Sequence, residues 1–391
     1  MSRILAVTYG AGHVNMIIPV AQKLIAHGHE VVVLALTTAW GPAHRAGLTT
    51  VGFRDYLSDS DERALEHGRR LIEGTTCHAD VHPDETVAYL GLSYSDLEDR
   101  MGVDRAASEF ALKGRQSLLP IGPLKRVFDT VKPNMLLTTN SPRGERASVL
   151  VAQELGAPSV VLNDLMPQSE MEWLSEVGYG DKVCVLSKGV KQRLVEAGRF
   201  EDEVVVTGNP AFDDLFDIDR KDLRSSWREK FGFGDEDRVV LFASQPDSDS
   251  ALGSRVAAAV VCAGRESGWK TVFRPHPNED FDANLLPEST PISGRDDDLF
   301  AALCGSDACV VISSSVGVQA AILGLPLVVL DIPVHADPAP YFMMGIGTTV
   351  QTAEAVFEAL NSGIGVSAFE SGKATVRIVT LIEELLRDRQ S

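Results

Sequence analysis

The sequence predicts an α/β protein made of two Rossmann-like, doubly wound domains, each with a parallel sheet. Short apolar runs, which suit strands buried on both faces, alternate with amphipathic helical stretches along most of the chain. Turns rich in glycine or hydroxyl residues follow several of these strands. The length of 391 residues is sufficient for two domains that each have a core.

Composition limits the partners that the chain can have. Apolar and charged residues make up 44% and 23% of the sequence, which is typical of globular proteins. The net charge of -19 argues against nonspecific nucleic-acid binding, which depends on clustered lysines and arginines. The first residues run into a strand without a signal sequence, so we expect a cytoplasmic protein. Because no apolar run could span a bilayer, we expect membrane contact to be peripheral at most.

The cysteines do not indicate a metal or disulfide framework. The five cysteines are odd in number and scattered, which favours reduced thiols. Cys304 and Cys309 have neither a second pair nor a histidine cluster to complete a zinc site. We therefore expect no metal site.

An N-terminal domain is predicted over residues 1–168, and its first β-α-β unit contains a glycine turn. The unit comprises a strand at 4–8, a helix that ends near 27 and a strand at 31–36. Gly10, Gly12 and His13 follow the first strand at its carboxyl end, where ligands bind in open α/β sheets. The spacing is not GxGxxG because Asn15 stands in place of the third glycine, so a dinucleotide fingerprint is weak.

His13 has two interpretations. A histidine at this sheet edge can act as a general base near neutral pH. A single histidine on a turn more often caps a helix or lies exposed. The adjacent Gly10 and Gly12 favour a functional role, because glycine allows the backbone to approach a ligand closely.

Residues 51–124 predict a helical insertion, since charged helical stretches replace the strand signals there. Such an insertion could form the acceptor-binding wall or a solvated helical pair. It contains a group of titratable residues that could suggest a metal or acid–base site: His78, His82, Asp84 and Glu85. Pro83 interrupts their spacing, which favours an exposed loop.

The alternation then resumes and completes the first sheet. It predicts strands at 135–139 and 159–162 with a helix at 146–155 between them. Asp164 follows the last of these strands and is a candidate acceptor-side residue. Residues 166–180 are predicted to cross to a second domain, which spans 169–372 and begins with a strand at 182–186. A final helix at 373–391 would pack back on the N-terminal domain.

Four strands of the second domain place polar loops at one sheet edge, where ligands bind in such sheets. The candidate donor-binding residues in and after these loops are Asn209, Ser244, Gln245, Arg274, His276, Ser313, Ser314, Ser315 and Gln319. One polar loop would mean little, but four at the same edge indicate a binding site.

The most complete unit of this domain is residues 307–333, which read as strand, turn, helix and strand. The three serines stand where the helix begins, so one of them can cap it, and Gly324 follows its predicted end. Together with Arg274 and His276, these hydroxyls and the helix amino terminus suit a phosphate group. Alternatively, Arg274 pairs with an acidic residue at 296–298 and His276 is a structural residue between two prolines.

These motifs resemble the nucleotide-sugar glycosyltransferases of the GT-B fold over nearly the whole chain. The resemblance rests on the glycine turn with His13, on GNP at 208–210, on RPHP at 274–277 and on SSSVGVQAAILGLPLV at 313–328. The segment GAGHVNMIIPVAQKLIAHGHEV is similar to the amino terminus of the lipid II-forming N-acetylglucosaminyltransferase and of macrolide-type glycosyltransferases. RPHP with SSS instead resembles capsule sialyl- or Kdo-transferases and CDP-glycerol polymerases.

The resemblance implies metal-independent transfer of a sugar from a nucleotide-activated donor to an acceptor hydroxyl, with no other cofactor. His13 or a nearby carboxylate would deprotonate the acceptor, in a cleft between the domains, while the second domain stabilises the leaving phosphate. Gln319 would reach the donor sugar or ribose, or else be buried against the sheet. His335 and Asp337 lie where related transferases bind the sugar.

The resemblance leaves the substrates open. The donor would be of the UDP/dTDP or the CMP/CDP type, and the acceptor a sugar, a lipid-linked compound or a small molecule. The pathway would be cell-envelope polysaccharide, glycolipid or natural-product glycosylation. The protein would be a monomer or a homodimer.

Two alternatives compete with this hypothesis. SSSVGVQ and the HPN at 276–278 also resemble the non-hydrolysing UDP-sugar 2-epimerases, which need carboxylates in the first domain. Here Asn140, Ser141 and Asn163 stand beside Asp164, the one acidic residue, so the epimerase ranks second. A third hypothesis is a nucleotide-sugar-binding partner without catalysis.

Overall fold

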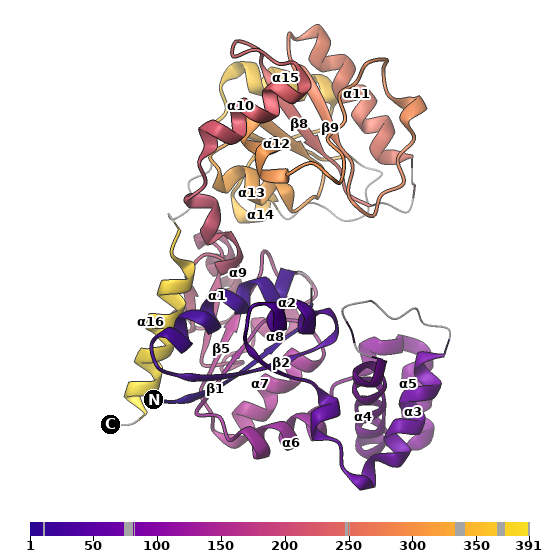
Figure 1. The fold of residues 1–391 in the computed structure, drawn as a ribbon, viewed down its shortest axis with the longest axis vertical. Coiled ribbons are helices and arrows are strands. Elements are labelled where there is room, and N and C mark those ends of the chain that lie inside the picture. Colours follow the sequence, from indigo (N-terminus) through magenta and orange to yellow (C-terminus); the bar gives the residue numbers. More distant parts are fainter. Residues whose placement is uncertain are drawn as a thin grey trace. The chain divides into compact units, whose positions relative to one another are not determined.

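The computed structural model describes residues 1–10, 12–73, 81, 83–246, 249, 251–332, 341–365 and 372–389. Backbone contacts divide the chain into two compact units (Figure 1). Unit 1 comprises Met1–Asp213 with Lys373–Ser391, and unit 2 comprises Asp214–Gly372. Among the described residues, no helix has the length and apolar character needed to cross a membrane.

Unit 1 is built on a seven-stranded parallel sheet with the order β3-β2-β1-β4-β5-β6-β7. Its strands are β1 (Arg3–Thr8), β2 (Glu30–Ala35), β3 (Thr49–Val51), β4 (Met135–Thr138), β5 (Ser159–Leu162), β6 (Lys182–Val185) and β7 (Val204–Val206). The central strands β1, β4 and β5 are almost wholly buried, as expected for a sheet covered on both faces. The strand order reverses between β1 and β4, and ligands bind at such switch points.

Helices connect the strands of this sheet and form the predicted insertion. The connecting helices are α1 (Gly12–Ala26), α2 (Trp40–Arg45), α7 (Gly144–Leu155), α8 (Met171–Leu174) and α9 (Lys188–Glu196). The insertion contains α3 (Glu62–Ile72), α4 (Pro83–Met101), α5 (Val103–Lys113) and α6 (Ile121–Val131), and α3 to α5 form a group beside the sheet (Figure 1). Helices α3 and α4 pack closely at Gly91, which has no Cβ. A Cβ at this position would lie 1.9 Å from the carbonyl oxygen of Ala64.

The C-terminal helix α16 (Ala374–Asp388) belongs to unit 1. Four of its buried side chains join the core formed by β1, β2 and α1: Ile378, Val379, Ile382 and Leu386. The carboxylate of Asp213 accepts hydrogen bonds from the first backbone N–H groups of the helix, those of Lys373 (3.0 Å), Ala374 (2.8 Å) and Thr375 (2.8 Å). Asp213 therefore caps α16 at the residue where the chain leaves unit 1.

The division between the units differs from the boundary predicted at residue 168. The strand expected to open the second domain, β6, pairs with β5, and β7 pairs with β6. The segment 166–180 therefore stays within unit 1, where the buried guanidinium of Arg199 donates to four of its backbone carbonyls. The chain passes into unit 2 after Asp213.

Unit 2 is built on a five-stranded parallel sheet with the order β12-β11-β10-β8-β9. Its strands are β8 (Val239–Ala243), β9 (Lys270–Arg274), β10 (Ala308–Val311), β11 (Leu327–Leu330) and β12 (Thr348–Val350). Its helices are α10 (Arg220–Phe231), α11 (Leu252–Glu266), α12 (Leu299–Gly305), α13 (Val316–Ile322), α14 (Tyr341–Met344) and α15 (Ala353–Ser362). The order reverses between β8 and β10, which are followed by Ser244 and by the three serines 313–315.

Candidate functional site

Three titratable side chains meet at the carboxyl edge of the unit 1 sheet. His13 lies in the first turn of α1 after β1, Glu145 in the first turn of α7 after β4, and Asp164 follows β5. Nδ1 of His13 is 3.2 Å from both carboxylate oxygens of Glu145. Nε2 of His13 is 3.7 Å from Oδ2 of Asp164, an ion-pair distance longer than a hydrogen bond. We call this group the His13 cluster.

Glu145 is a fixed, buried anion. Its side chain is fully buried, and its carboxylate accepts hydrogen bonds from the Tyr9 backbone N–H (2.6 Å), the Thr139 hydroxyl and the Ser141 backbone N–H. Burial alone would raise the pKa of Glu145, but the contact with His13 and these donors outweigh it and lower the pKa. Glu145 thus stays ionised and holds the imidazole by its Nδ1 side.

His13 is a cation in this arrangement. Burial of the ring opposes its charge, but the carboxylates of Asp164 and Glu145 outweigh burial and raise the pKa of His13 to about 10. The side chain of His13 is 20% exposed and that of Asp164 39%. Because Nδ1 faces Glu145, Nε2 is the ring nitrogen on the more open side of the cluster.

The two predicted glycines have different surroundings. A Cβ on Gly10 would lie 1.7 Å from Oγ1 of Thr38. The group that lies close to the backbone of Gly10 is therefore the side chain of Thr38. A Cβ on Gly12 would meet nothing within 4 Å. Gly12, in the same turn as His13, is exposed, so the space beside it is open.

In unit 2, buried carboxylate and amide groups link the loops after three strands. Oγ of Ser244 donates to Glu279 (2.9 Å), and the same carboxylate accepts a hydrogen bond from the backbone N–H of His276 (2.9 Å). Oε1 of Gln245 accepts a hydrogen bond from the backbone N–H of Ser313 (3.3 Å). The structure therefore joins the loops after β8, β9 and β10, and it adds Glu279, which the sequence analysis did not single out.

Two amide side chains of unit 2 retain unused polar atoms. Nε2 of Gln245 and Oε1 of Gln319 are buried and have no hydrogen-bond partner among the described residues. Buried polar atoms without a partner are rare in native proteins and often mark a ligand or water site. Both residues remain candidates for donor binding.

Arg274 and His276 are partly engaged by the protein itself. The guanidinium of Arg274 donates to Oγ of Ser293 (2.8 Å) and to the carbonyl of Asp297 (3.0 Å), close to the structural role considered for it above. Nδ1 of His276 accepts a hydrogen bond from the backbone N–H of Asn278 (3.1 Å), so a neutral ring carries its proton on Nε2. Phosphate binding by either side chain stays a prediction.

Asn209 does not belong with the other candidate donor residues. It lies in unit 1, where its Nδ2 donates to the carbonyl of Asp164 (2.9 Å) and its Oδ1 accepts from the backbone N–H of Ala211 (2.9 Å). Its predicted place among the loops of the second sheet was wrong, because β7, the strand before it, joins the first sheet; donor binding by Asn209 stays a prediction. Asn209 instead helps to fix the backbone of Asp164.

The serine loop also differs in detail from its prediction. Ser315 is exposed and occupies the N-cap position of α13, but it makes no side-chain capping bond. Ser314 is buried, and its carbonyl accepts a hydrogen bond from the Tyr341 hydroxyl. His335 and Asp337 lie outside the described residues.

Glu85 corrects the prediction of an exposed loop in the insertion. It is 3% exposed and accepts hydrogen bonds from the backbone N–H groups of Phe53 (2.8 Å) and Arg54 (3.1 Å). Burial raises the pKa of Glu85 to about 7, against the opposing effect of these donors. Its role is therefore to fix the loop before α3; His78 and His82 lie outside the described residues.

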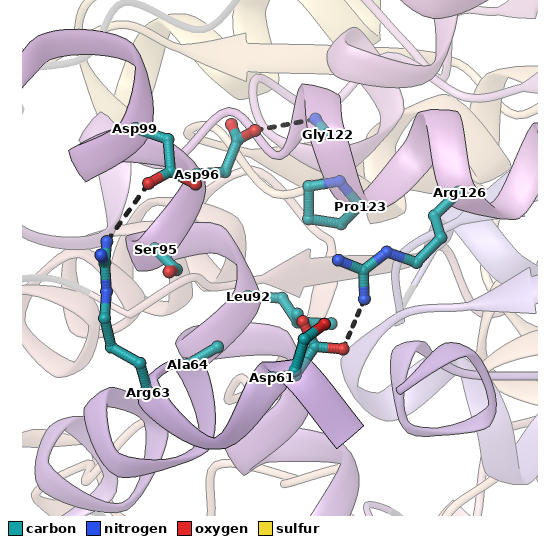
Figure 2. Close-up of a pocket in the computed structure, with 11 residues that line it drawn as sticks. Asp61, Arg63, Ala64, Leu92, Ser95, Asp96, Asp99, Gly122, Pro123 and Arg126 are labelled. Carbon is teal, nitrogen blue, oxygen red and sulfur yellow. Dashed lines mark hydrogen bonds and ion pairs between the residues drawn. The ribbon is translucent and has the colours of Figure 1, made fainter. Parts of the chain in front are cut away.

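The insertion also contains a polar pocket of about 350 Å³ between α3, α4 and α6 (Figure 2). Its carboxylates are engaged by neighbouring helices. Asp61 pairs with Arg126 (2.5 Å), Asp99 pairs with Arg63 (3.2 Å), and Asp96 accepts a hydrogen bond from the backbone N–H of Gly122 (2.8 Å). These contacts hold the helices together, and each of the three carboxylates has a partner within the protein. The His13 cluster is therefore the stronger candidate site.

Comparison with known proteins shows the fold. No protein-family model and no curated protein matches the chain. The UDP-GlcNAc 2-epimerase from Neisseria meningitidis, solved bound to UDP-GlcNAc, is similar with a TM-score of 0.58 at 15% identity, over 98% of this chain and 100% of that one.

Glycosyltransferases are similar to a comparable degree. A glycosyltransferase from Rickettsia africae matches with a TM-score of 0.53 at 14% identity, over 99% of this chain and 93% of that one. The calicheamicin glycosyltransferase CalG4 matches with a TM-score of 0.53 at 15% identity, over 97% and 93%. The predicted GT-B fold class, with two parallel α/β sheets, is confirmed. At these identities the likeness shows the fold alone.

Proposed function

We propose that this chain is a glycosyltransferase that moves a sugar from a nucleotide-activated donor to an acceptor hydroxyl. The observation that carries the proposal is His13, held at Nδ1 by the buried Glu145 with Nε2 on the more open side. A carboxylate that orients an imidazole is the arrangement by which proteins make histidine a general base. The linked polar loops of unit 2 support nucleotide binding, and one solved structure of this fold holds UDP-GlcNAc.

In this proposal the neutral ring of His13 accepts the proton of the acceptor hydroxyl at Nε2. The hydroxyl oxygen bonds to the anomeric carbon while the bond between that carbon and the nucleotide phosphate breaks. The products are the glycoside and the free nucleotide, and the proton remains on His13 until solvent takes it. Glu145 and Asp164 stabilise the imidazolium that forms.

Unit 2 would bind the donor and stabilise the leaving phosphate. The unpaired amide atoms of Gln245 and Gln319 would hydrogen-bond the nucleotide. Arg274, His276 and the serines at 313–315 are the candidates for its phosphate groups, as charged or hydroxyl donors. No step of this scheme requires a metal ion.

A second candidate function is a non-hydrolysing UDP-sugar 2-epimerase, and Glu145 is the observation that favours it. From the sequence, the epimerase hypothesis ranks second because Asp164 is the one acidic residue predicted at the ends of the later strands of the first domain. In the structure, Glu145 places a second carboxylate against His13. Epimerisation requires a group that takes and returns a proton. The lowered pKa of Glu145 and its several donors make it a poor proton acceptor, so we prefer glycosyl transfer.

One set of assays separates these functions. A thermal-shift screen with UDP, dTDP, GDP, CMP and CDP would identify the nucleotide, since a ligand of the folded state raises Tm. Incubation with the matching nucleotide-sugar alone, followed by NMR, would reveal a C2 epimer if the chain is an epimerase. Nucleotide release that depends on an added acceptor supports transfer. Binding without either reaction would indicate a non-catalytic partner, and no binding at all would contradict the proposal.

A further inference from the structure

Buried polar atoms without partners gather beside the His13 cluster. Fourteen buried side-chain nitrogen or oxygen atoms have no hydrogen-bond partner within the described part of the chain. Four of the fourteen belong to residues 140–146: Asn140 Oδ1, Ser141 Oγ, Arg143 Nε and Arg146 Nε. This segment connects β4 to the first turn of α7, which carries Glu145. Because such atoms are normally few, four of them within seven consecutive residues mark a place where a ligand or water would complete the hydrogen bonds.

The two arginines are held in place by aromatic rings. The guanidinium of Arg143 lies over the ring of Tyr9 at 4.9 Å, and that of Arg146 over the ring of Trp173 at 4.6 Å. Both rings are buried, with exposed fractions of 7% and 3%. Stacking uses the faces of a guanidinium and leaves the N–H donors at its edges available. Each arginine is thus pre-oriented for a planar or tetrahedral oxyanion.

Neither arginine has an acidic partner of its own. Over the described ranges, no carboxylate lies within ion-pair distance of Arg143 or Arg146. This is unusual in a chain with a net charge of -19. The nearby carboxylates, Glu145 and Asp164, contact His13. With His13 protonated, these five side chains carry one excess positive charge, which a bound monoanion would neutralise.

Asn140 adds a hydrogen-bond acceptor of fixed direction. Nδ2 of Asn163 donates to the carbonyl of Leu165 (2.9 Å), so Oδ1 of Asn163 is the atom that accepts from Nδ2 of Asn140 (2.8 Å). This leaves Oδ1 of Asn140 as a buried acceptor in a residue that is 3% exposed. A ligand hydroxyl would satisfy it. The segment therefore suits a molecule with both an oxyanion and a hydroxyl group.

We propose that Arg143 and Arg146 bind an oxyanion, a carboxylate or a phosphate, on the acceptor substrate, and that Asn140 accepts a hydrogen bond from one of its hydroxyls. This inference rests on the proposed transferase function, because only a transferase has an acceptor substrate. It narrows the acceptor to a compound that carries both a hydroxyl group and a negatively charged carboxylate or phosphate. Arg143 and Arg146 are then specificity-determining residues, whereas His13 carries the proton transfer.

The test compares three sugars that share a ring: D-glucose, D-glucuronate and D-glucose 6-phosphate. Calorimetry on the full chain measures their binding, at constant ionic strength, to wild type, Arg143→Gln, Arg146→Gln and the control Arg105→Gln, which makes the same charge change on the exposed side of α5. We expect one or both anionic sugars to bind at least roughly tenfold more tightly than D-glucose, and each site variant to lose roughly tenfold. The control should bind like wild type. Which anionic sugar binds better distinguishes carboxylate from phosphate.

Two results overturn the inference: D-glucose binding as tightly as both anionic sugars, or site variants that bind them like wild type. A loss of nucleotide binding in the same variants that matches the loss of sugar binding would assign the arginines to the donor and overturn it as well. If the wild-type protein binds anionic sugars but no nucleotide, the proposed function is contradicted and the anion site remains supported.

A second measurement covers the case in which the variants do not fold. Because Trp173 stacks on Arg146, an oxyanion bound there should change its fluorescence. We expect the anionic sugars to alter the emission of wild type and not that of Trp173→Phe, which keeps an aromatic ring at this position. An unchanged wild-type emission at saturating sugar would contradict the inference.

Discussion

Nδ1 of His13 lies 3.2 Å from the carboxylate of Glu145, and the side chain of Glu145 is fully buried in unit 1. The contact joins two strand ends that adjoin at the switch point of the sheet, those of β1 and β4. It fixes the ring and holds it protonated, so the chemistry of the site depends on when that proton leaves.

The proposed reaction should be faster at alkaline pH. The pKa of His13 is raised to about 10 by the carboxylates of Asp164 and Glu145, against the effect of burial, and only the neutral ring can accept a proton. We expect kcat/KM for nucleotide release to rise from pH 7 towards pH 10. Asp164→Asn removes one negative charge and should move the rise to lower pH. A rate that is constant from pH 6 to pH 9 would instead assign proton transfer to Asp164.

His13 should also make stability depend on pH. Its pKa is near 6.5 in an unfolded chain and about 10 in the folded protein, so the folded state holds the proton more tightly. The resulting stabilisation is complete below pH 6.5 and is lost as the pH rises to 10. Urea unfolding at pH 6 and pH 9 should show a larger loss of free energy in wild type than in His13→Asn. Equal losses would contradict the assigned pKa.

Glu145→Gln should strongly destabilise unit 1. The glutamine amide has one accepting oxygen where the carboxylate of Glu145 has two. The substitution also removes the buried negative charge that balances the positive charge of His13. We expect a loss of about 3 kcal/mol or more in urea unfolding. Glu154→Gln on the same helix is the control: Glu154 is exposed and pairs with Lys125 at 2.6 Å, so about 0.5 kcal/mol is expected. Similar effects at the two positions would refute the role given to Glu145.

Asp213→Ala should weaken the attachment of α16. The variant loses an acceptor for three backbone N–H groups at the helix start, which costs about 1–2 kcal/mol. Asp214→Ala changes the adjacent exposed carboxylate and should cost less than about 0.5 kcal/mol. Hydrogen exchange of α16 amides measures the effect locally, and unchanged exchange in Asp213→Ala would contradict it.

Gln245→Ala should weaken nucleotide binding by unit 2. Its buried Nε2 is free to donate, and loss of one hydrogen bond to a ligand costs about 0.5–1.5 kcal/mol. Calorimetry with the nucleotide found by the thermal-shift screen would measure this. Gln192→Ala, on an exposed face of α9, should bind like wild type. If both variants bind equally, Gln245 has no role in donor recognition.

Local apolar patterns were sufficient to place most strands, but pairing and side-chain partners were not predictable. The predicted bounds of β5, 159–162, match the structure, because this strand is a short apolar run between turn signals. Asn209 was assigned to the wrong unit because the apolar patterns of β6 and β7 suit either sheet, and the choice depends on distant contacts. Glu145 was missed because α7 begins at Gly144, two residues before its predicted start, and its N-cap Arg143 makes no side-chain capping bond.

The return of the chain to unit 1 has a consequence for synthesis on the ribosome. Unit 2 is one uninterrupted segment, Asp214–Gly372, so all of its strands are synthesised before α16 and emerge ahead of it. Unit 1, although it begins first, lacks Ile378, Val379 and Ile382 of its core until the 15 residues of α16 have emerged. A nascent chain stopped before Lys373 would therefore carry a complete unit 2 and an uncovered apolar surface on unit 1, the kind of surface that chaperones bind.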